Sequence, residues 1–203
     1  GNAYGDYVHY GATSQDVMDT ALVLQLRACI EHLEDLLNQT IQALGHMADA
    51  HRHTLMAGRT HSQQALPISF GFKAAGWLSP LLRHRQRLQE LKPRLLVIQF
   101  GGAVGTLAAL NQHGIEIQAA LAAELGLHVP LMVWHTQRDT LVEFAGWLAI
   151  VTGSLAKMAQ DIILMAQSEI AEIYESDDPL RGGSSTMPQK RNPVVSEIII
   201  GVA

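Results

Sequence analysis

The sequence predicts an all-α protein built as a bundle of long helices. Of its 203 residues 48% are hydrophobic, but aromatic residues make up only 5%. The apolar share is therefore mostly Ala, Leu, Ile and Val, which favours helices packed on helices over an aromatic-rich β-sandwich. Apolar residues also recur every three or four positions over long stretches, which is the periodicity of an amphipathic helix. Both observations point to the same fold class.

The first long helix is expected from Thr13 or Ser14 to about His53. Either hydroxyl can cap its start. An apolar stripe then follows one face, made of Leu22, Leu26, Ile30, Leu33, Leu37, Ile41, Leu44 and Ala48. A turn over residues 58–61 ends this first part of the chain.

A second helical stretch is expected from about Pro67 to Phe100. Proline removes a backbone donor and clashes with the preceding turn. We therefore expect this helix to be interrupted or kinked near Pro80 and Pro93. The glycine-rich run over residues 101–105 ends it.

A short helix from about Ile115 to Leu125 precedes a third long helix, expected over about residues 136–174. The long helix is apolar almost all round between Phe144 and Ala166, so other helices must enclose it. One chain of this length has too few helices to do so. We therefore expect subunits to associate through these helices.

A last helix is expected after Asn192 and Pro193, because asparagine is a good N-cap and proline suits the first helical position. This helix reaches the end of the sequence after about three turns. We therefore expect residues 1–203 to form the central helical-bundle domain of a longer protein.

Charge and composition narrow the choice of partners. The formal net charge is −5, which argues against a nucleic-acid partner. No uninterrupted apolar stretch approaches the roughly 18 residues of a membrane span. The single cysteine, Cys29, fits a reducing compartment. We expect a cytoplasmic protein whose partners are small molecules and other subunits.

The sequence does not predict a metal ion or a dinucleotide cofactor. It contains no CxxC or HExxH pattern and no clustered carboxylate–histidine spacing. Its glycine-rich run lies between expected helices, whereas a dinucleotide-binding turn joins a strand to a helix. We therefore expect chemistry without a cofactor.

A polar loop over residues 176–191 is the first candidate for chemistry. Gly182 and Gly183 allow backbone freedom, and Ser184 and Ser185 offer hydroxyls. Cations follow at positions 190 and 191, beside the start of the last helix, so the loop has the components of an anion site. The alternative is a solvated Gly-Ser linker, which would not need the ordered Met-Pro and Asn-Pro punctuation.

Three blocks of sequence resemble the fumarase/aspartase superfamily. Residues 183–193, GSSTMPQKRNP, match its GSSxMPxKxNP signature. Residues 9–16, HYGATSQD, and residues 58–61, GRTH, resemble its first two conserved regions in order and spacing. The resemblance implies a cofactor-free enzyme that acts on a small polycarboxylate. It also implies a homotetramer whose active sites are assembled from different subunits.

Within the superfamily, the chain most resembles the bacterial 3-carboxy-cis,cis-muconate cycloisomerases. The resembling stretches are HYGATSQDVMDTALVLQLR, LRHRQRLQELKPRLLVIQFGGAVGTLAAL and WHTQRDTLVEFAGWLA. Adenylosuccinate lyase, which eliminates fumarate, is the alternative, because it shares the first block and the GAVGT turn. An alternative of another class is a non-catalytic structural homologue that has kept the fold.

The resemblance implies specific roles for several residues. Ser184 would move a proton at the carbon next to a carboxylate, and Lys190 and Asn192 would hold substrate carboxylate and its developing charge. Thr13 and Ser14 would bind a second carboxylate, although helix capping is the commoner role of such a pair. The further residues that the resemblance assigns to the site are His9, Thr60, Gln137, Arg138, Ser185 and Met187.

His61 distinguishes the two candidate reactions. The resemblance gives it the position of a general acid, or part of one, in lyases that expel an amine. An amine leaving group needs a proton, whereas a lactone opens to a carboxylate that is already a stable anion at neutral pH. His61 would therefore be essential in an adenylosuccinate-type lyase and less so in a cycloisomerase.

Overall fold

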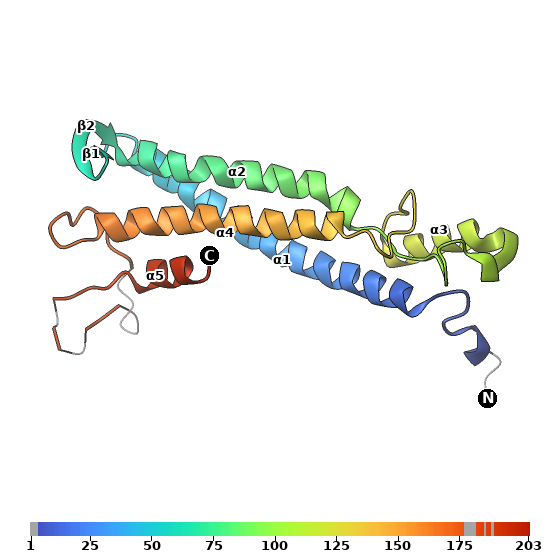
Figure 1. Cartoon of the computed structure of the whole chain (residues 1–203). Helices are drawn as coiled ribbons and strands as arrows, with labels where there is room; N and C mark the ends of the chain where they lie inside the picture. The colour runs from blue at the N-terminus through green and yellow to red at the C-terminus, as the bar shows by residue number, and fades with distance from the viewer. Residues whose placement is uncertain (1–3, 177–181, 185, 188) are drawn as a thin grey trace. The chain divides into compact units, whose positions relative to one another are not determined.

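The computed structural model describes residues 4–176, 182–184, 186–187 and 189–203 (Figure 1). The chain divides into two compact units. Unit 1 comprises residues 1–36 and 86–145, and unit 2 comprises residues 37–85 and 146–203. The long helices contribute residues to both units, so each unit is built from segments far apart in the sequence.

The chain is mostly helical, as the sequence predicts, and each predicted helix is present. The helices are η1 (Gly5–Tyr7), α1 (Ser14–Ala50), α2 (Phe70–Leu95), η2 (Ala108–His113), α3 (Gly114–Leu125), α4 (Asp139–Met165) and α5 (Val194–Gly201). The three long helices are shorter than expected. Helix α4 differs most, because it begins at Asp139 and ends at Met165, well before Tyr174.

The prediction of an all-α fold is wrong in one place. Strand β1 (Leu55–Thr60) pairs antiparallel with β2 (Gln63–Ser69) in a two-stranded sheet. The pair Thr60–Gln63 encloses a two-residue turn of His61 and Ser62, whose φ angles are 51° and 61°. Two positive φ angles define the hairpin turn that Asn-Gly usually signals. His-Ser is not one of the dipeptides typical of this turn, so the sequence alone predicts a turn without flanking strands.

Helix α2 differs from the predicted second helix in where it begins and in being continuous. It begins at Phe70, because Pro67 belongs to β2, and it continues without a break through Pro80 and Pro93. Proline disturbs a helix mainly by clashing with the carbonyl four residues earlier and by removing one hydrogen bond. Packing compensates for that cost, since Trp77, Leu81, Leu88 and Leu91 are all buried.

The core of unit 1 brings together four segments. Its buried members are Val23 of α1, Ile98 and Phe100 after α2, Leu107 and Leu110 around η2, Ala122 of α3, and Leu127. Two backbone hydrogen bonds join the segment after α2 to the segment after α3, from Ile98 N to His128 O and from His128 N to Leu96 O, each 2.9 Å. These contacts join the segment after α2 to the segment after α3, and the apolar cluster packs both against Val23 of α1.

In unit 2, indole groups tie α2 to α4. Trp77 Nε1 donates to Asp161 Oδ2 at 2.7 Å, and Trp147 Nε1 donates to the carbonyl oxygen of His84 at 2.9 Å. His84 Nε2 also lies 2.8 Å from Ser154 Oγ. Buried polar groups with such partners orient the two helices as well as joining them.

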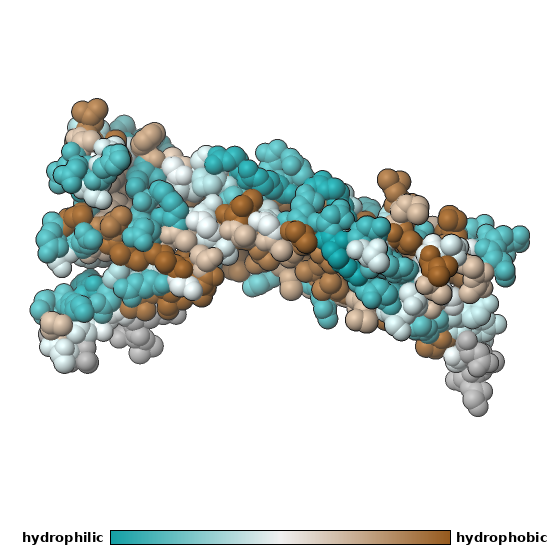
Figure 2. Space-filling view, viewed as in Figure 1, coloured by the Kyte–Doolittle hydropathy of each residue, from teal (hydrophilic) through white to brown (hydrophobic). Residues whose placement is uncertain are grey.

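Helix α4 carries more apolar surface than this chain covers. Among the described helices, it is the one with the length and hydropathy of a membrane span, a property that core helices of soluble proteins share. Ile150 and Leu164 are both more than 40% exposed, as is Ile198 of α5. Figure 2 shows apolar side chains over this part of the surface.

Candidate active site

In unit 1, the start of α1 carries the first predicted block. Thr13 immediately precedes the helix, and its backbone N–H donates to Asp16 Oδ2 at 2.9 Å. A carboxylate three residues into a helix that accepts from the capping residue forms half of a capping box. Thr13 is half-buried and Ser14 is exposed.

Asp16 also binds the glycine-rich turn and the WHTQR segment. Its Oδ1 accepts from Gly101 N at 3.0 Å and from His135 Nε2 at 2.6 Å, while Oδ2 accepts from Gly102 N at 2.8 Å. Burial raises the pKa of this carboxyl, but the hydrogen bonds of Thr13, His135, Gly102 and Gly101 outweigh it and hold the pKa below its usual value. The group is therefore a buried carboxylate at neutral pH.

Asp19, one turn further along α1, binds the guanidinium of Arg138. The two distances are 2.8 Å from NH1 to Oδ1 and 3.2 Å from NH2 to Oδ2. Arg138 NH2 also donates to the carbonyl oxygen of His135 at 2.7 Å, and its guanidinium lies 5.5 Å from the ring centre of Trp134. These contacts engage much of the guanidinium. The contact of Arg138 with substrate, which the family resemblance implies, stays a prediction.

Two other predicted residues of unit 1 lie at the surface. His9 is exposed and has a φ of 66°, which bends the chain before Gly11. Gln137 is exposed beside the Arg138–Asp19 pair. Both are accessible to a ligand, and their roles remain predictions.

In unit 2, the hairpin carries the second predicted block. Thr60 and His61 are exposed at its tip. Arg59, just before them, forms two hydrogen bonds with Glu172, at 2.7 and 2.8 Å. The hydrogen bond from Arg59 holds the pKa of Glu172 below its usual value, although burial opposes it. This pair joins β1 to the segment that follows α4.

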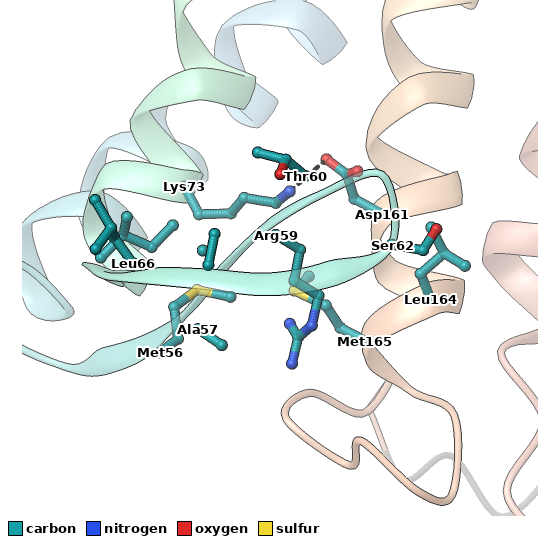
Figure 3. Close-up of a pocket in the computed structure, with 13 residues that line it drawn as sticks. Met56, Ala57, Arg59, Thr60, Ser62, Leu66, Lys73, Asp161, Leu164 and Met165 are labelled. Carbon is teal, nitrogen blue, oxygen red and sulfur yellow. Dashed lines mark ion pairs between the residues drawn. The ribbon is translucent and has the colours of Figure 1, made fainter.

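A pocket of about 510 Å³ lies between the hairpin, α2 and the end of α4 (Figure 3). Thr60 and Arg59 are among its lining residues, and most of the others are apolar. The ion pair between Lys73 Nζ and Asp161 Oδ2, 3.1 Å apart, also lies in its wall. The pocket thus lies directly beside the predicted hairpin residues.

The signature loop, also in unit 2, surrounds Ser184 with backbone donors. Its half-buried hydroxyl oxygen accepts from Met187 N at 3.1 Å and from Thr186 N at 3.4 Å. Backbone N–H groups that point at one oxygen stabilise negative charge on it. This arrangement supplies part of what a serine needs to act in proton transfer.

The ends of the signature loop are held together. Asn192 N donates to Gly182 O at 2.9 Å, and Gly183 pairs with Arg191 in an isolated antiparallel bridge. Gly182 has a φ of 74°, and a Cβ there would lie 2.8 Å from Asn192 O. Within the loop, Lys190 N donates to Met187 O at 3.0 Å.

The predicted residues of this loop are otherwise placed as follows. Met187 and Lys190 are exposed, and Asn192 is half-buried at the start of α5. Ser185 lies outside the described residues. Within the described ranges, no group of three or more His, Cys, Asp or Glu side chains is placed to hold a metal ion.

Sequence reasoning missed the carboxylates that organise unit 1. Asp16 and Asp19 are 2% and 4% exposed, and His135 contacts the first of them. The spacing Thr13-x-x-Asp16 is that of a capping box and could have singled out Asp16. No local pattern links either aspartate to residues near position 135.

A comparison with protein families identifies the chain. A family model described as Lyase matches residues 2–203. The chain belongs to this lyase family, within the fumarase/aspartase superfamily. The resemblance that the three blocks indicate is thereby confirmed.

Two similar proteins are named as enzymes of 3-carboxy-cis,cis-muconate. The chain is 55% identical to the 3-carboxy-cis,cis-muconate cycloisomerase of Pseudomonas aeruginosa over 197 residues, 97% of this chain and 43% of that protein. The crystal structure of 3-carboxy-cis,cis-muconate lactonizing enzyme from Pseudomonas putida has a TM-score of 0.91 and 53% identity. The match covers 96% of this chain and 44% of that one.

An adenylosuccinate lyase is also similar to this chain. The adenylosuccinate lyase of Methanocaldococcus jannaschii is 42% identical over 206 residues, which cover 100% of this chain and 44% of that protein. This chain therefore spans less than half the length of each of these relatives.

Proposed function

We propose that the protein containing this chain is a cofactor-free cycloisomerase. It would interconvert 3-carboxy-cis,cis-muconate and a carboxymuconolactone. The observation that carries this proposal is the hydroxyl oxygen of Ser184, which accepts backbone hydrogen bonds inside the signature loop. Similarity to cycloisomerases at 55% and 51% identity supports the choice of substrate.

The proposed reaction moves one proton and one carbon–oxygen bond. In the lactonizing direction, a carboxylate oxygen of the substrate bonds to one carbon of the diene. The neighbouring carbon, which is next to a carboxylate, then takes a proton from Ser184. In the reverse direction Ser184 removes that proton as the carbon–oxygen bond breaks and the carboxylate leaves.

The charge that develops in this reaction explains the other loop residues. Removing a proton next to a carboxylate produces a dianion, so fixed cations and N–H donors stabilise the transition state more than the ground state. We assign to Lys190 and Asn192 the stabilisation of that charge. The N–H groups of Thr186 and Met187 would stabilise the alkoxide of Ser184.

A second carboxylate would bind at the start of α1. Helix α1 has 37 residues, and the N-terminus of a helix presents free N–H groups with a partial positive charge. Ser14 is exposed there and Thr13 is half-exposed. We assign both hydroxyls to substrate, with His9, Thr60, Gln137, Arg138, Ser185 and Met187 as further contacts.

The alternative activity is elimination of fumarate from adenylosuccinate. Similarity to an adenylosuccinate lyase along the whole chain supports it, as does the exposed position of His61 at the hairpin tip. In that reaction Ser184 would act as base and His61 would help to protonate the leaving amine.

We further propose a homotetramer with shared active sites, located in the cytoplasm. The exposed apolar residues of α4 and α5 support association between subunits, because large apolar surfaces are costly in water. The predicted site residues are also divided between unit 1 and unit 2.

Ultraviolet absorbance of the full-length protein with each substrate tests the function. Loss of the diene signal from 3-carboxy-cis,cis-muconate, with no response to adenylosuccinate, supports the cycloisomerase. The opposite result supports the lyase. A folded protein that acts on neither substrate contradicts both and favours the non-catalytic homologue.

The Ser184→Ala variant tests the mechanism. We expect it to lose at least about 10²-fold in kcat, the lower range for removing a general acid or base. Ser79→Ala, an exposed serine of α2, is the matched control and should retain activity. Unchanged kcat in Ser184→Ala would contradict the assigned role.

A further inference from the structure

The geometry points to Asp16 as a positioning residue of the active site. We infer that its carboxylate sets the place of Thr13 and Ser14 by joining the start of α1 to the Gly101–Gly102 turn and to His135. This inference rests on the proposed role of Thr13 and Ser14 in binding a substrate carboxylate.

The contacts of Asp16 link three segments far apart in the sequence. Oδ2 accepts from Thr13 N at 2.9 Å and from Gly102 N at 2.8 Å. Oδ1 accepts from Gly101 N at 3.0 Å and from His135 Nε2 at 2.6 Å. Oδ1 also accepts a longer hydrogen bond, of 3.4 Å, from Gln99 Nε2. Oδ2 therefore holds two donors and Oδ1 three, and each oxygen binds one amide of the turn.

A local helix cap does not account for this arrangement. A capping box needs only the contact with Thr13. The other donors lie more than 80 positions away in the sequence, and the carboxylate is 2% exposed. Burying a charge so completely is costly unless several donors compensate it, so the site is built around the carboxylate.

The glycine turn also approaches the segment before Thr13. Gly102 has a φ of 72°, and a Cβ there would lie 2.9 Å from Gly11 O. Gly11 and Thr13 are two residues apart, so the turn contacts the first block both directly and through Asp16. The position of the exposed Ser14 thus depends on a turn about 90 residues later.

Replacing Asp16 by asparagine removes one of its two accepting oxygens and changes the volume of the side chain little. An amide has one accepting oxygen, and its nitrogen is a donor. Whichever way the amide lies, its NH₂ group faces at least two of the five donors. The Thr13–Gly102 side or the Gly101–His135 side must therefore open.

Kinetics of the full-length protein test the inference. We expect Asp16→Asn to lower kcat/KM about 10²-fold, the effect of misplacing a binding group by about 1 Å. Ser14→Ala and Asp16→Asn should be non-additive, because both act through the same substrate contact. Fully additive losses, or unchanged kcat and KM in Asp16→Asn, would overturn it.

Arg27→Met is the matched control. Arg27 NH1 donates to Leu125 O at 2.7 Å, so this variant also loses a hydrogen bond between α1 and a segment far away in the sequence. Arg27 lies about three turns beyond Asp16 on α1. We expect this variant to lower the Tm and to leave KM unchanged, which separates positioning from general destabilisation.

Hydrogen exchange keeps the test independent of the substrate. Asp16→Asn should speed exchange of the Thr13, Gly101 and Gly102 amides, and Arg27→Met should not. If the wild type acts on neither substrate, this result still decides whether Asp16 holds the three segments. Should Asp16→Asn fail to fold, His135→Leu removes one donor, because leucine has no polar group, and should change the same amides. Unchanged exchange in His135→Leu would overturn the inference.

Discussion

The carboxylate of Glu175 accepts two hydrogen bonds from Ser196, from its backbone N–H at 2.8 Å and from its hydroxyl at 2.7 Å. Glu175 Oε2 also accepts from Val195 N at 3.1 Å. Glu175 precedes the signature loop and Ser196 belongs to the first turn of α5. One carboxylate therefore joins the two ends of the loop and caps the helix that follows.

The Glu175→Gln variant should loosen this connection. We expect it to reduce the free energy of unfolding by about 1 kcal/mol, as for loss of a helix cap. Activity should fall as well, because the loop carries Ser184. Urea unfolding and kcat measure the two effects, and Glu169→Gln is a control just upstream. Equal stability of Glu175→Gln and wild type would contradict the capping role.

Two glycines of α2 should respond oppositely to alanine. A Cβ at Gly71 would collide with Ala48 O and lie 2.8 Å from the backbone nitrogen of Arg52, whereas Gly76 has no atom within 4 Å of such a Cβ. Gly71→Ala should therefore cost about 1–3 kcal/mol. Gly76→Ala should gain about 0.5–1 kcal/mol. Thermal unfolding of both variants measures these changes, and a stable Gly71→Ala would mean that α1 and α2 can separate at this point.

The Arg59–Glu172 pair should stabilise the hairpin beside His61. A double-mutant cycle of Arg59→Met and Glu172→Gln should give a coupling energy of about 1 kcal/mol, the upper range for exposed pairs, because the contact is bidentate. High salt should reduce that coupling. A coupling energy near zero at low salt would show that the pair does not contribute to stability.

Asp161 should make unit 2 sensitive to acid. Burial raises its pKa, but hydrogen bonds from Lys157, Trp77 and Lys73 outweigh this and hold the pKa below the usual 3.8. A lowered folded-state pKa means that the stabilisation is complete above about pH 3.8 and is lost as the pH falls through the lower, folded-state value. Asp161→Asn should therefore be less stable than wild type by about 2 kcal/mol at pH 7. Urea unfolding should show this difference shrinking below pH 3.8, and a constant difference would contradict the prediction.

Local patterns were sufficient to predict the helices and the signature loop. The stripe that includes Ile30 and Leu37 predicts α1, and both residues are buried. Asn192 and Pro193 predict the start of α5, which begins at Val194. These features depend on periodicity and capping, which neighbouring residues express directly.

Two features of the fold depend on packing and were not predictable in this way. Pro80 lies inside a continuous helix because the buried face of α2 outweighs the local cost of proline. The hairpin forms around His61 and Ser62, which both adopt positive φ angles although residues other than glycine rarely do. In both cases tertiary contacts override a local preference.

Residue type and spacing are enough to identify the family, the helical class and the motifs that bear Ser184, His61 and Thr13. The groups that hold those motifs in place are found in the folded chain alone. Asp16 binds His135 and Asp19 binds Arg138, although more than 100 residues separate the members of each pair. Such pairs form when folding buries charge and brings compensating donors to it, and no neighbouring residue signals them.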